Sequence, residues 1–265
     1  MPEGDSVYQL SKRLQFMTGR EVLRTSLRVP KYATVRFDGT TCDRVWPYGK
    51  HLFMQFGQQI LRTHLKMEGT WAMHLAGTRW RKPGYTARVV LELEGAPHPK
   101  PIEVVGFSLG LVEVFPVAEY RERMGYLGPD MLAEDFDFDE VAKRIRSRPE
   151  RTIGQALLDQ KNAAGIGNEY RAEICFLAGI DPRSKVSDVD VEAVVKIARR
   201  LMWTNKDSPI RVTTGVRRAG ESSYVFGRNH KPCRRCGTLI EQDFLGGGED
   251  LERVIWWCPH CQLLA

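Results

Sequence analysis

The chain has 265 residues, of which 42% are hydrophobic and 27% charged, and its formal net charge is +6. This is the composition of an ordinary globular protein, and the length suits two domains, or one domain with a small appendage. No apolar run approaches the roughly 20 residues of a membrane span, and the start MPEGDSVYQL lacks the basic-then-apolar order of a targeting peptide. We therefore expect a cytoplasmic protein with no membrane association. Cys42 and Cys175 stand in apolar surroundings, as buried free thiols do, which indicates a reducing compartment.

The N-terminal half begins with a helical pattern and continues with β patterns. Apolar side chains recur three or four residues apart between Val7 and Met17, which predicts a short amphipathic helix. From about residue 21 to 116 the chain consists of short β-rich runs divided by Gly, Pro and Asp, such as ATVRF (33–37) and HLFMQF (51–56). This texture predicts an antiparallel sandwich or barrel.

Helical periodicity returns in the C-terminal half. Asp137 or Asp139 could cap the first helix, and Ser187 with Asp190 gives the last one a start that resembles a capping box. Residues 206–228 have the pattern of a loop. The predicted helices are 137–147, 152–160, 168–178 and 187–204.

The expected fold is a multi-domain α+β protein with three structured parts. An N-terminal antiparallel β-sandwich with an N-terminal helix should occupy residues 1–117, followed by a linker at 118–136 that is rich in acid and glycine. A helical domain should then occupy 137–228, and a ribbon that binds zinc should occupy 229–265.

Four cysteines near the C-terminus carry the strongest single motif, C-x2-C-x21-C-x2-C. A two-residue gap lets two thiolates of one turn point at one ion, and two such turns complete a tetrahedral zinc site. The alternative, two disulfides in a secreted protein, is disfavoured by the missing signal peptide and by the size of the chain. With four thiolates the site is closed, so we expect one structural Zn²⁺. Its ligands are Cys233, Cys236, Cys258 and Cys261.

Charge distribution indicates a polyanionic partner more clearly than net charge does. Acid is concentrated at 134–140, whereas base is concentrated at 143–151 and 228–235 and in two Arg-Arg pairs of the same half. Each cluster alone would suit a solvated helix face. Several arginine clusters beside a zinc ribbon favour nucleic acid, because arginine pairs with phosphate.

The stretch DQKNAAGIGNEYRAE (159–173) predicts a tight turn that leads into a helix. Gly165, Gly167 and Asn168 lie between two helical segments, so backbone N–H groups at the helix N-terminus could bind phosphate, and Asn168 is placed to cap and to donate. A plain turn between helices is the alternative.

The chain starts Met1-Pro2-Glu3, which becomes chemically interesting if Met1 is removed. Pro2 is then a free secondary amine, and an α-amino group has a pKa of about 7.7–8.0, so a useful fraction is unprotonated at neutral pH. Its attack on an aldehyde carbon gives an iminium with no N–H to lose, which is a strong electron sink. Glu3 could then act as acid and base. Taken alone, this start is common and carries no function.

Four motifs in this order resemble one family: PEGDSV at the start, the lysine of PYGKHL, the turn GIGNEYRAE and the terminal RVIWWCPHCQ. The chain resembles the formamidopyrimidine-DNA glycosylase and endonuclease VIII family of base-excision repair enzymes almost from end to end. The resemblance implies a bifunctional DNA glycosylase and abasic-site lyase that acts on damaged double-stranded DNA near the nucleoid. It also implies a monomer, and single-stranded or bubble DNA remains an alternative substrate.

The resemblance also implies roles for particular residues. Pro2 would be the nucleophile that attacks C1′, forms a covalent iminium and permits β- and then δ-elimination, while Glu3 would shuttle protons. Lys50 would bind phosphate and assist the reaction. Asn168, in the helix–two-turn–helix motif, and Arg253, in the zinc hairpin, would grip the phosphates beside the lesion. Outside this context, Lys50 and Arg253 could be plain surface charges.

Enzymes of this kind flip the damaged nucleotide out of the helix and fill the gap with wedging side chains. The resemblance assigns the first wedge to Met67 and a phosphate contact to His64, although core packing is the alternative for Met67. The next loop, VGFSLGLVEV (105–114), lacks the arginine found in the purine-directed branch. Phe107 or Leu109 could substitute for it.

Three further departures bear on the substrate. Asp5 stands near a position where glutamate or proline is frequent, the cysteine pairs are separated by an inserted GGGEDLE (246–252), and residues 206–228 are too few for an extended lesion-capping loop. These features favour the endonuclease VIII-like branch, which prefers oxidised pyrimidines. The stretch SPIRVTTGVRRAGESSYVFGR (208–228) resembles the actinobacterial endonuclease VIII-like proteins in particular. Three alternatives remain: an oxidised-purine (8-oxoguanine or formamidopyrimidine) glycosylase, a lyase acting mainly on abasic sites or single strands, and a catalytically silent nucleic-acid-binding protein.

Overall fold

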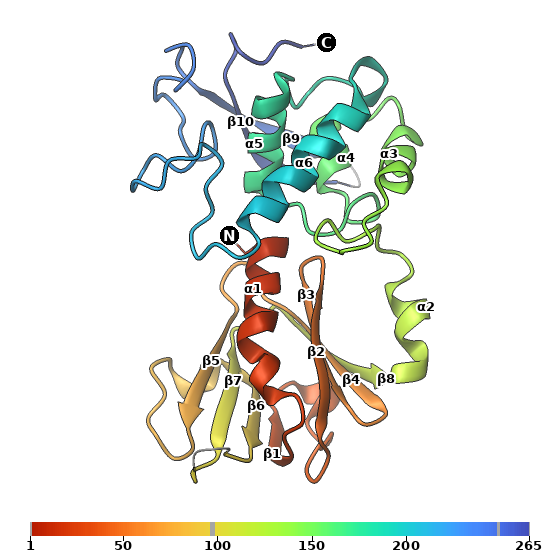
Figure 1. Ribbon diagram of the computed structural model, residues 1–265, viewed down its shortest axis with the longest axis vertical. Coiled ribbons are helices and arrows are strands. Elements are labelled where there is room, and N and C mark those ends of the chain that lie inside the picture. Colours follow the sequence, from red (N-terminus) through yellow and green to blue (C-terminus); the bar gives the residue numbers. More distant parts are fainter. Residues whose placement is uncertain (1, 96–98, 248–249, 265) are drawn as a thin grey trace. The chain divides into compact units, whose positions relative to one another are not determined.

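The structure is a computed structural model that describes residues 2–95, 99–247 and 250–264 (Figure 1). The chain divides into two compact units. Unit 1 comprises the first two residues and Ser6–Gly125, and unit 2 comprises Glu3–Asp5 and the chain from Tyr126 onward. Within the described ranges, no helix is long and apolar enough to cross a lipid bilayer.

Unit 1 contains two four-stranded antiparallel sheets, as expected for a sandwich. The first sheet has the strand order β1-β6-β7-β5, and its strands are β1 (Val22–Leu27), β5 (Thr70–Leu75), β6 (Ala87–Leu93) and β7 (Ile102–Phe107). The second has the order β2-β3-β4-β8, and its strands are β2 (Cys42–Tyr48), β3 (His51–Phe56), β4 (Gln59–His64) and β8 (Leu111–Pro116). The run HLFMQF is therefore a strand over its full length.

The core of unit 1 joins both sheets to the first helix. Helix α1 (Gly4–Leu14) contributes buried Leu10 and Leu14 to a single hydrophobic cluster that also contains Leu52 of β3 and Leu91 of β6. Burying an aliphatic side chain of this size contributes about 1.5–3 kcal/mol. The amphipathic helix predicted at the start of the chain is confirmed, and it packs against the two sheets (Figure 1).

The run ATVRF (33–37), which was expected to be a strand, is not one. Pro30 starts a 3-10 turn, η2 (Pro30–Tyr32), and the backbone N–H of Phe37 donates to the hydroxyl of Thr25 at 3.0 Å instead of joining a ladder. The ring of Phe37 is buried and stacks on Phe56 with 4.5 Å between centroids. Phe37 therefore packs in the hydrophobic core from a loop and not from a strand.

The remaining elements of unit 1 are short. Residues 118–136, expected as a linker, include most of one 3-10 turn and a short helix that ends just before the boundary between the two units. Besides η2, the short elements of unit 1 are η1 (Gln15–Met17), η3 (Gly84–Thr86), η4 (Val117–Glu119) and α2 (Tyr120–Met124).

Unit 2 contains the four predicted helices, with local caps that explain where they begin. Asp137 caps the first by accepting from Glu140 N at 2.9 Å, and Thr152 forms a capping box at the second. The expected start at Ser187 is wrong, because Ser187 lies in the 3-10 turn η5 (Val186–Asp188) and Asp190 is the N-cap of the last helix. The helices are α3 (Phe138–Arg146), α4 (Ile153–Leu158), α5 (Asn168–Ala178) and α6 (Val191–Asn205).

The C-terminal part of unit 2 is a hairpin of β9 (Glu241–Gly247) and β10 (Asp250–Trp257), and the two cysteine pairs flank it. Buried Ala172 and Phe176 of α5 share a hydrophobic cluster with Ile240, next to β9. The hairpin region is therefore packed on α5. As expected, residues 206–228 contain no helix or strand in the described structure.

Candidate functional site

The carboxylate of Glu3 is seated at the N-terminus of α5. It is fully buried and accepts hydrogen bonds from the backbone N–H groups of Gly167 at 2.6 Å, Glu169 at 2.9 Å and Tyr170 at 3.4 Å. These are the N–H groups that a helix leaves unpaired in its first turn, and the helix dipole favours a negative charge there. The expectation that these groups bind phosphate and that Asn168 caps the helix is wrong, because Gly167 is the N-cap residue and Glu3 satisfies them.

The turn before α5 needs glycine in order to receive the start of the chain. A Cβ at Gly167 would lie 2.3 Å from Cδ of Glu3, and Gly165 has a left-handed φ of +115°. Gly4 N also donates to Gly165 O at 3.0 Å. Glu3 and Gly4 are therefore tied to this turn, and half-buried Pro2 directly precedes them. Met1 lies outside the described residues.

Three carboxylates gather at this helix end, and we call Glu3, Asp5 and Glu169 the acidic cluster. Arg211 forms ion pairs with Asp5 and Glu169 and lies 3.8 Å from Glu3, and the Tyr170 hydroxyl donates to Asp5 at 2.9 Å. Burial lowers the pKa of Arg211, but the hydrogen bond with Asp5 and the charges of the cluster outweigh burial and raise that pKa above its ordinary value. The guanidinium is therefore permanently charged.

Asn168 links α5 to the hairpin. Its Nδ2 donates to the carbonyl of Val254 at 3.0 Å, and Arg171 donates to the same carbonyl at 2.7 Å and to the Asn168 side-chain oxygen. Arg253, whose side chain is exposed, directly precedes Val254 on β10. Asn168 and Arg253 are thus brought to one place in unit 2, and the second N–H of the Asn168 amide can still donate.

Arg171 is an unusual cation, because 1% of the residue is exposed. Burial lowers the pKa of its guanidinium to about 10. Its Nε and Nη1 have no hydrogen-bond partner among the described residues. It serves chiefly to hold Asn168 against Val254.

In unit 1 the structure brings Lys50 and His64 to the same end of one sheet. Lys50 lies in the two-residue turn between the paired residues Tyr48 and His51, and His51 pairs in turn with His64. Burial, followed by the charges of Lys66, Lys50 and a neighbouring arginine, lowers the pKa of His64 to about 4. His64 is therefore neutral at pH 7.

The tautomer of His64 follows from its surroundings. The backbone N–H of Lys66 donates to Nδ1 of His64 at 2.8 Å, so the proton of the neutral ring is on Nε2. The ring can therefore donate one hydrogen bond through Nε2, as a phosphate contact requires.

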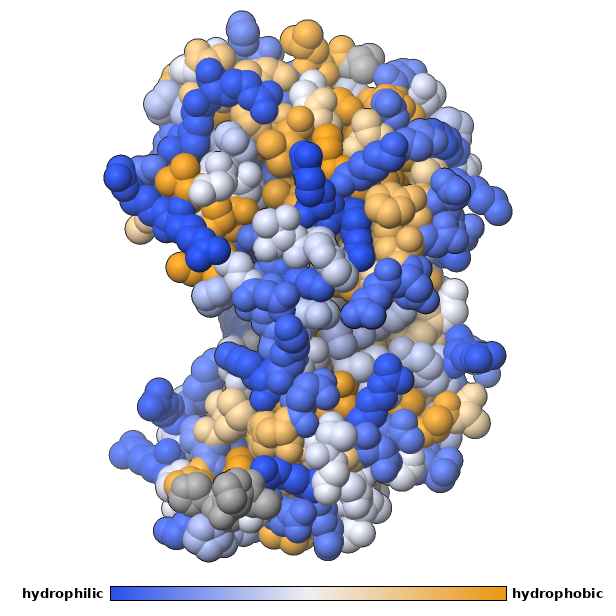
Figure 2. Space-filling view, viewed as in Figure 1, coloured by the Kyte–Doolittle hydropathy of each residue, from blue (hydrophilic) through white to orange (hydrophobic). Residues whose placement is uncertain are grey.

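Met67 is an exposed apolar side chain at the turn between β4 and β5. Hydrophilic residues predominate over both units on the face seen in Figure 2, with hydrophobic residues scattered among them. Against that background, Met67 is 68% exposed. The turn is tight, because a Cβ at Gly69 would lie 2.4 Å from the carbonyl oxygen of Leu65. Core packing, the alternative for Met67, is excluded.

The two candidates for the missing arginine of loop 105–114 are buried. Phe107 is 0% exposed and packs edge to face on Trp80, and Leu109 is 7% exposed and belongs to the core of unit 1. Neither side chain presents a surface that a base could contact. The expectation that Phe107 or Leu109 takes over that role is therefore wrong in this structure.

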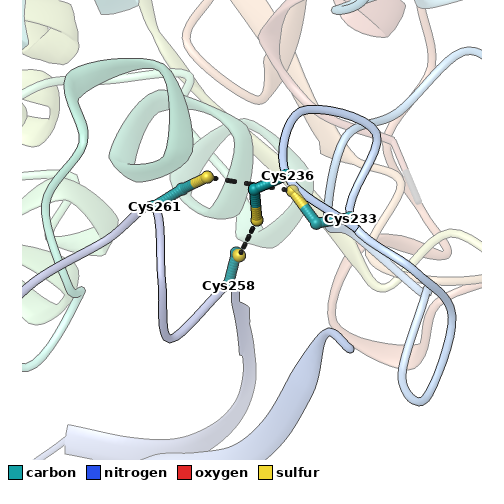
Figure 3. A group of neighbouring side chains, drawn as sticks. All are labelled: Cys233, Cys236, Cys258 and Cys261. Atoms are coloured by element: carbon teal, nitrogen blue, oxygen red, sulfur yellow. Dashed lines mark hydrogen bonds between the residues drawn. The ribbon is translucent and has the colours of Figure 1, made fainter. Parts of the chain in front are cut away.

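The four C-terminal cysteines point their sulfurs toward one another (Figure 3). All four Sγ atoms lie within 4.8 Å of one another, with Cys236 and Cys258 at 3.5 Å and Cys233 and Cys261 at 4.0 Å. A tetrahedral thiolate site with Zn–S bonds of about 2.3 Å has its sulfurs about 3.8 Å apart. The group could therefore hold one metal ion.

The electrostatics of the same sulfurs also call for a cation. Hydrogen bonds with Thr238 lower the pKa of the Cys236 thiol to about 6. Burial, and then the neighbouring sulfurs, raise the pKa of Cys261 to about 12. One thiolate forms readily and opposes the ionisation of its neighbours, and a bound divalent ion would remove that conflict.

Glu173 of α5 is, after Glu3, a second fully buried carboxylate of unit 2. It is fully buried and accepts from the backbone N–H groups of Tyr224 at 2.8 Å, Val225 at 2.9 Å and Phe226 at 2.9 Å, and from the hydroxyl of Thr213. It thereby holds both ends of the loop formed by residues 213–226.

Sequence reasoning missed several of these residues. Glu169, Arg171 and Glu173 were considered only as part of the turn motif. Charged residues in a helix that is buried on nearly all sides need charged or hydrogen-bonding partners, and this was the missed signal. Asp5 was noted only as a departure from the family pattern. Arg211 has no signal in the sequence, because it lies in a segment without periodicity.

Two family models match the chain. Residues 1–101 match the N-terminal domain of formamidopyrimidine-DNA glycosylase, and residues 127–208 match its H2TH domain. Among solved structures, MutM in complex with DNA containing carbocyclic 8-oxo-G superposes with a TM-score of 0.82 at 20% identity, covering 99% of this chain and 100% of that chain. At this identity the likeness shows the fold.

Curated relatives are more similar and match over nearly their whole length. The chain is 39% identical to the probable endonuclease 8 2 of Streptomyces coelicolor, covering 99% of this chain and 94% of the relative. It is 41% identical to endonuclease 8 2 of Mycobacterium tuberculosis, covering 99% and 100%. It is 39% identical to the DNA-(apurinic or apyrimidinic site) lyase Nei2 of Mycolicibacterium smegmatis, covering 99% of each.

Proposed function

This chain belongs to the formamidopyrimidine-DNA glycosylase and endonuclease VIII family of DNA-repair glycosylases and abasic-site lyases, and from that premise we propose that it excises oxidised pyrimidines with Pro2 as its nucleophile. The observation that carries the proposal is the seat of Glu3 at the N-terminus of α5. A carboxylate held by three backbone N–H groups is fixed immediately beside the proline.

The proposed reaction requires the loss of Met1, which makes Pro2 a secondary amine. Its nitrogen lone pair forms a bond to C1′ while the bond from C1′ to the base breaks, and the base leaves with the bonding electrons and takes up a proton. The nitrogen loses its proton, the sugar ring opens as its oxygen gains one, and an iminium forms. Loss of a proton from C2′ then expels the 3′ phosphate, and a second proton loss expels the 5′ phosphate.

Glu3 directly follows Pro2 and supplies the carboxylate that carries protons in this scheme. Its N–H donors stabilise the carboxylate over the acid. An ionised carboxylate next to the nucleophile can take the proton that the amine releases and return it to the sugar oxygen or the leaving group. Gly167, which has no side chain, leaves the space that the carboxylate occupies.

Each unit carries proposed contacts to damaged double-stranded DNA. In unit 2, the Asn168 amide and the exposed Arg253 lie together and suit phosphates beside the lesion. In unit 1, Lys50 and the Nε2–H of His64 share one sheet end and suit a second set of phosphates. Exposed Met67 suits the role of the wedge that fills the space left by a flipped nucleotide.

We assign one structural Zn²⁺ to Cys233, Cys236, Cys258 and Cys261, on the strength of four convergent sulfurs. Zinc would hold the ends of the hairpin together and supply no step of the reaction, because four thiolates leave no open coordination position. The chain's own residues then keep β10 in place, since Val254 is gripped by Asn168 and Arg171.

Support for pyrimidines comes from the endonuclease 8 relatives and from the missing arginine in loop 105–114. The segment 206–228 is also pinned close to α5 by Glu173, which leaves few residues to cover a larger damaged base. An oxidised-purine enzyme is the contrasting outcome.

Borohydride trapping tests nucleophile and substrate together, because it reduces the iminium to a stable cross-link. The protein, with loss of Met1 verified by intact mass, is incubated with duplexes bearing an oxidised pyrimidine, an oxidised purine or an abasic site. We expect cross-links that map to Pro2, fastest with the pyrimidine lesion among the two damaged bases. Faster reaction with the purine lesion would reverse the substrate class, and no cross-link with any duplex would indicate a silent DNA-binding protein.

A further inference from the structure

Arg211 contacts the acidic cluster with all three nitrogens of its guanidinium. Nε donates to Asp5 at 2.8 Å and Nη2 donates to the other oxygen of the same carboxylate, whereas Nη1 donates to Glu169 at 2.5 Å and lies 3.8 Å from Glu3. The Arg211 side chain is 10% exposed. The same guanidinium lies over the ring of Tyr170 at 4.5 Å.

The shape of the guanidinium matters as much as its charge. Three neighbouring carboxylates, of which Glu3 and Asp5 are buried, repel one another, and one planar guanidinium can bind two of them at once while it faces the third. A lysine would bring a single point charge that cannot reach all three positions. Arg211 therefore fixes the mutual arrangement of Glu3, Asp5 and Glu169.

Arg211 is presented from a rigid support. The next residue, Val212, donates its N–H to Asn205 Oδ1 at 2.7 Å and accepts from Asn205 Nδ2 at 3.0 Å. Asn205 is 2% exposed and ends α6. One residue further on, Thr213 N donates to Ser222 O at 2.8 Å. The backbone that carries Arg211 thus has fixed partners before DNA arrives.

We propose that Arg211 is a positioning residue for the reaction, which holds Glu3 and Asp5, and through them the Pro2 amine, in the reactive arrangement. This inference rests on the proposed function, because it assumes that the chemistry occurs at Pro2. Arg211 itself touches no reacting atom in this scheme. It ties the segment 206–228 to the first residues of the chain.

The test compares single-turnover excision and DNA affinity in the full-length protein and in Arg211→Met. Excision is followed on a duplex with an oxidised pyrimidine, and affinity is measured on a duplex with an uncleavable abasic-site analogue. We expect the maximal rate to fall about 100-fold, the effect of a misplacement near 1 Å, while the dissociation constant changes less than about twofold. A wild-type rate, or an equal loss in rate and affinity, would refute the positioning role.

Arg211→Lys keeps the charge and serves as the second variant if Arg211→Met does not fold. We expect it to recover part of the rate, to within about tenfold of wild type, because a charge is restored without the fork. A rate equal to wild type would show that geometry is unimportant and would overturn the inference. Both variants are checked for a cooperative thermal transition.

Arg183→Met is the matched control. Arg183 also makes a bidentate pair, with Asp181, and lies over the ring of Trp257 at 4.0 Å, but it is not in contact with the acidic cluster. We expect excision at the wild-type rate. An equal loss in Arg183→Met would mean that breaking any arginine–carboxylate pair of unit 2 slows excision, which contradicts a specific role for Arg211.

The site of the cross-link separates the two proposals. If the wild-type cross-link maps to an amine other than Pro2, the proposed function fails, whatever the Arg211 variants do. If it maps to Pro2 and Arg211→Met traps DNA at the wild-type rate, the proposed function stands and the positioning role fails.

Discussion

The carboxylate of Glu3 lies 2.6 Å from the backbone nitrogen of Gly167, a residue 164 positions further along the chain. The sequence of the turn predicted that the N-terminus of α5 binds a DNA phosphate. In the structure the carboxylate of Glu3 occupies that position. Glu3 becomes part of the α5 cap, so the third and fourth residues of the chain are hydrogen-bonded to the turn before that helix.

Gly167→Ala should unseat Glu3. The added Cβ would lie 2.3 Å from Cδ of Glu3, so either the helix start or the carboxylate must shift, at a cost of about 1–3 kcal/mol in the free energy of unfolding. Urea unfolding measures that cost, and borohydride trapping should slow at least about tenfold. Gly84→Ala is the control, because its nearest neighbour is Trp80 at 3.9 Å. Unchanged trapping in Gly167→Ala would argue against a role for the seat.

Glu173→Gln should loosen the loop formed by residues 213–226. The charged carboxylate that accepts four hydrogen bonds becomes an amide that presents a donor to the same N–H groups, so we expect a loss of about 2 kcal/mol in unfolding free energy. Urea titration with tryptophan fluorescence reports it. The exposed Glu241 on β9 provides the comparison, and Glu241→Gln should leave the midpoint in place. Equal midpoints for both variants would contradict the anchoring role.

Met67→Ala should separate duplex from single-stranded substrates. If Met67 fills the space left by a flipped nucleotide, excision from duplex should slow about tenfold, whereas excision from a single strand, which has no stack to fill, should be unaffected. Stability should not change, because Met67 is 68% exposed. Met73→Ala, on β5 with 45% exposure, is the same change elsewhere in unit 1. Similar effects of the two substitutions would remove Met67 from the wedge role.

Zinc removal should act on DNA through Arg253. Metal analysis should find one zinc per chain, and a chelator should weaken DNA binding and lower the slope of log affinity against log salt by about 1, the loss expected for one phosphate contact. Arg253→Ala should give the same slope with the metal still bound. Adding zinc back should restore the wild-type protein but not the variant. A chelator effect that persists unchanged in Arg253→Ala would place the lost contact elsewhere.

Acidification should destabilise unit 1 through two histidines. Burial, and then the charge of Arg62, lowers the pKa of His51 to about 2, and that of His64 falls to about 4. Unfolded histidine titrates near 6.5, so between pH 6.5 and 4 the unfolded chain binds protons that the folded chain excludes, and stability falls as pH falls. Each group contributes up to about 1.4 kcal/mol per pH unit in that window.

Urea unfolding at pH 7 and pH 5 measures this dependence. His64→Gln should flatten it by removing one of the two groups, although its stability at pH 7 can also change. An undiminished pH dependence in His64→Gln would mean that His64 is not excluded from protonation in the folded state.

Local patterns were sufficient for most of the elements and for the cluster of four cysteines. The period of α1, the strand HLFMQF and the cysteine spacing each depend on neighbours in sequence, and the structure has all three as expected. Contacts between distant segments were not accessible in this way. The N-terminus of α5 seemed available to a ligand, because the carboxylate that binds there comes from Glu3, far away in the sequence. The run ATVRF resembled a strand, because the pattern of apolar residues does not show whether they reach the core from a strand or from a loop.

The loop that ends the helical part is fastened to α5 at two residues one helical turn apart, through Arg211 to Glu169 and through Thr213 to Glu173. The Thr214 hydroxyl donates to the carbonyl of Glu221, and Arg234 donates to the carbonyl of Gly220, so the tip beyond these contacts is residues 215–219. Because closing a longer loop costs little extra entropy, this tip can gain residues without disturbing either anchor. Insertions at this tip can therefore change the loop while its two contacts with α5, and the contact of Arg211 with Asp5 near the start of the chain, stay the same.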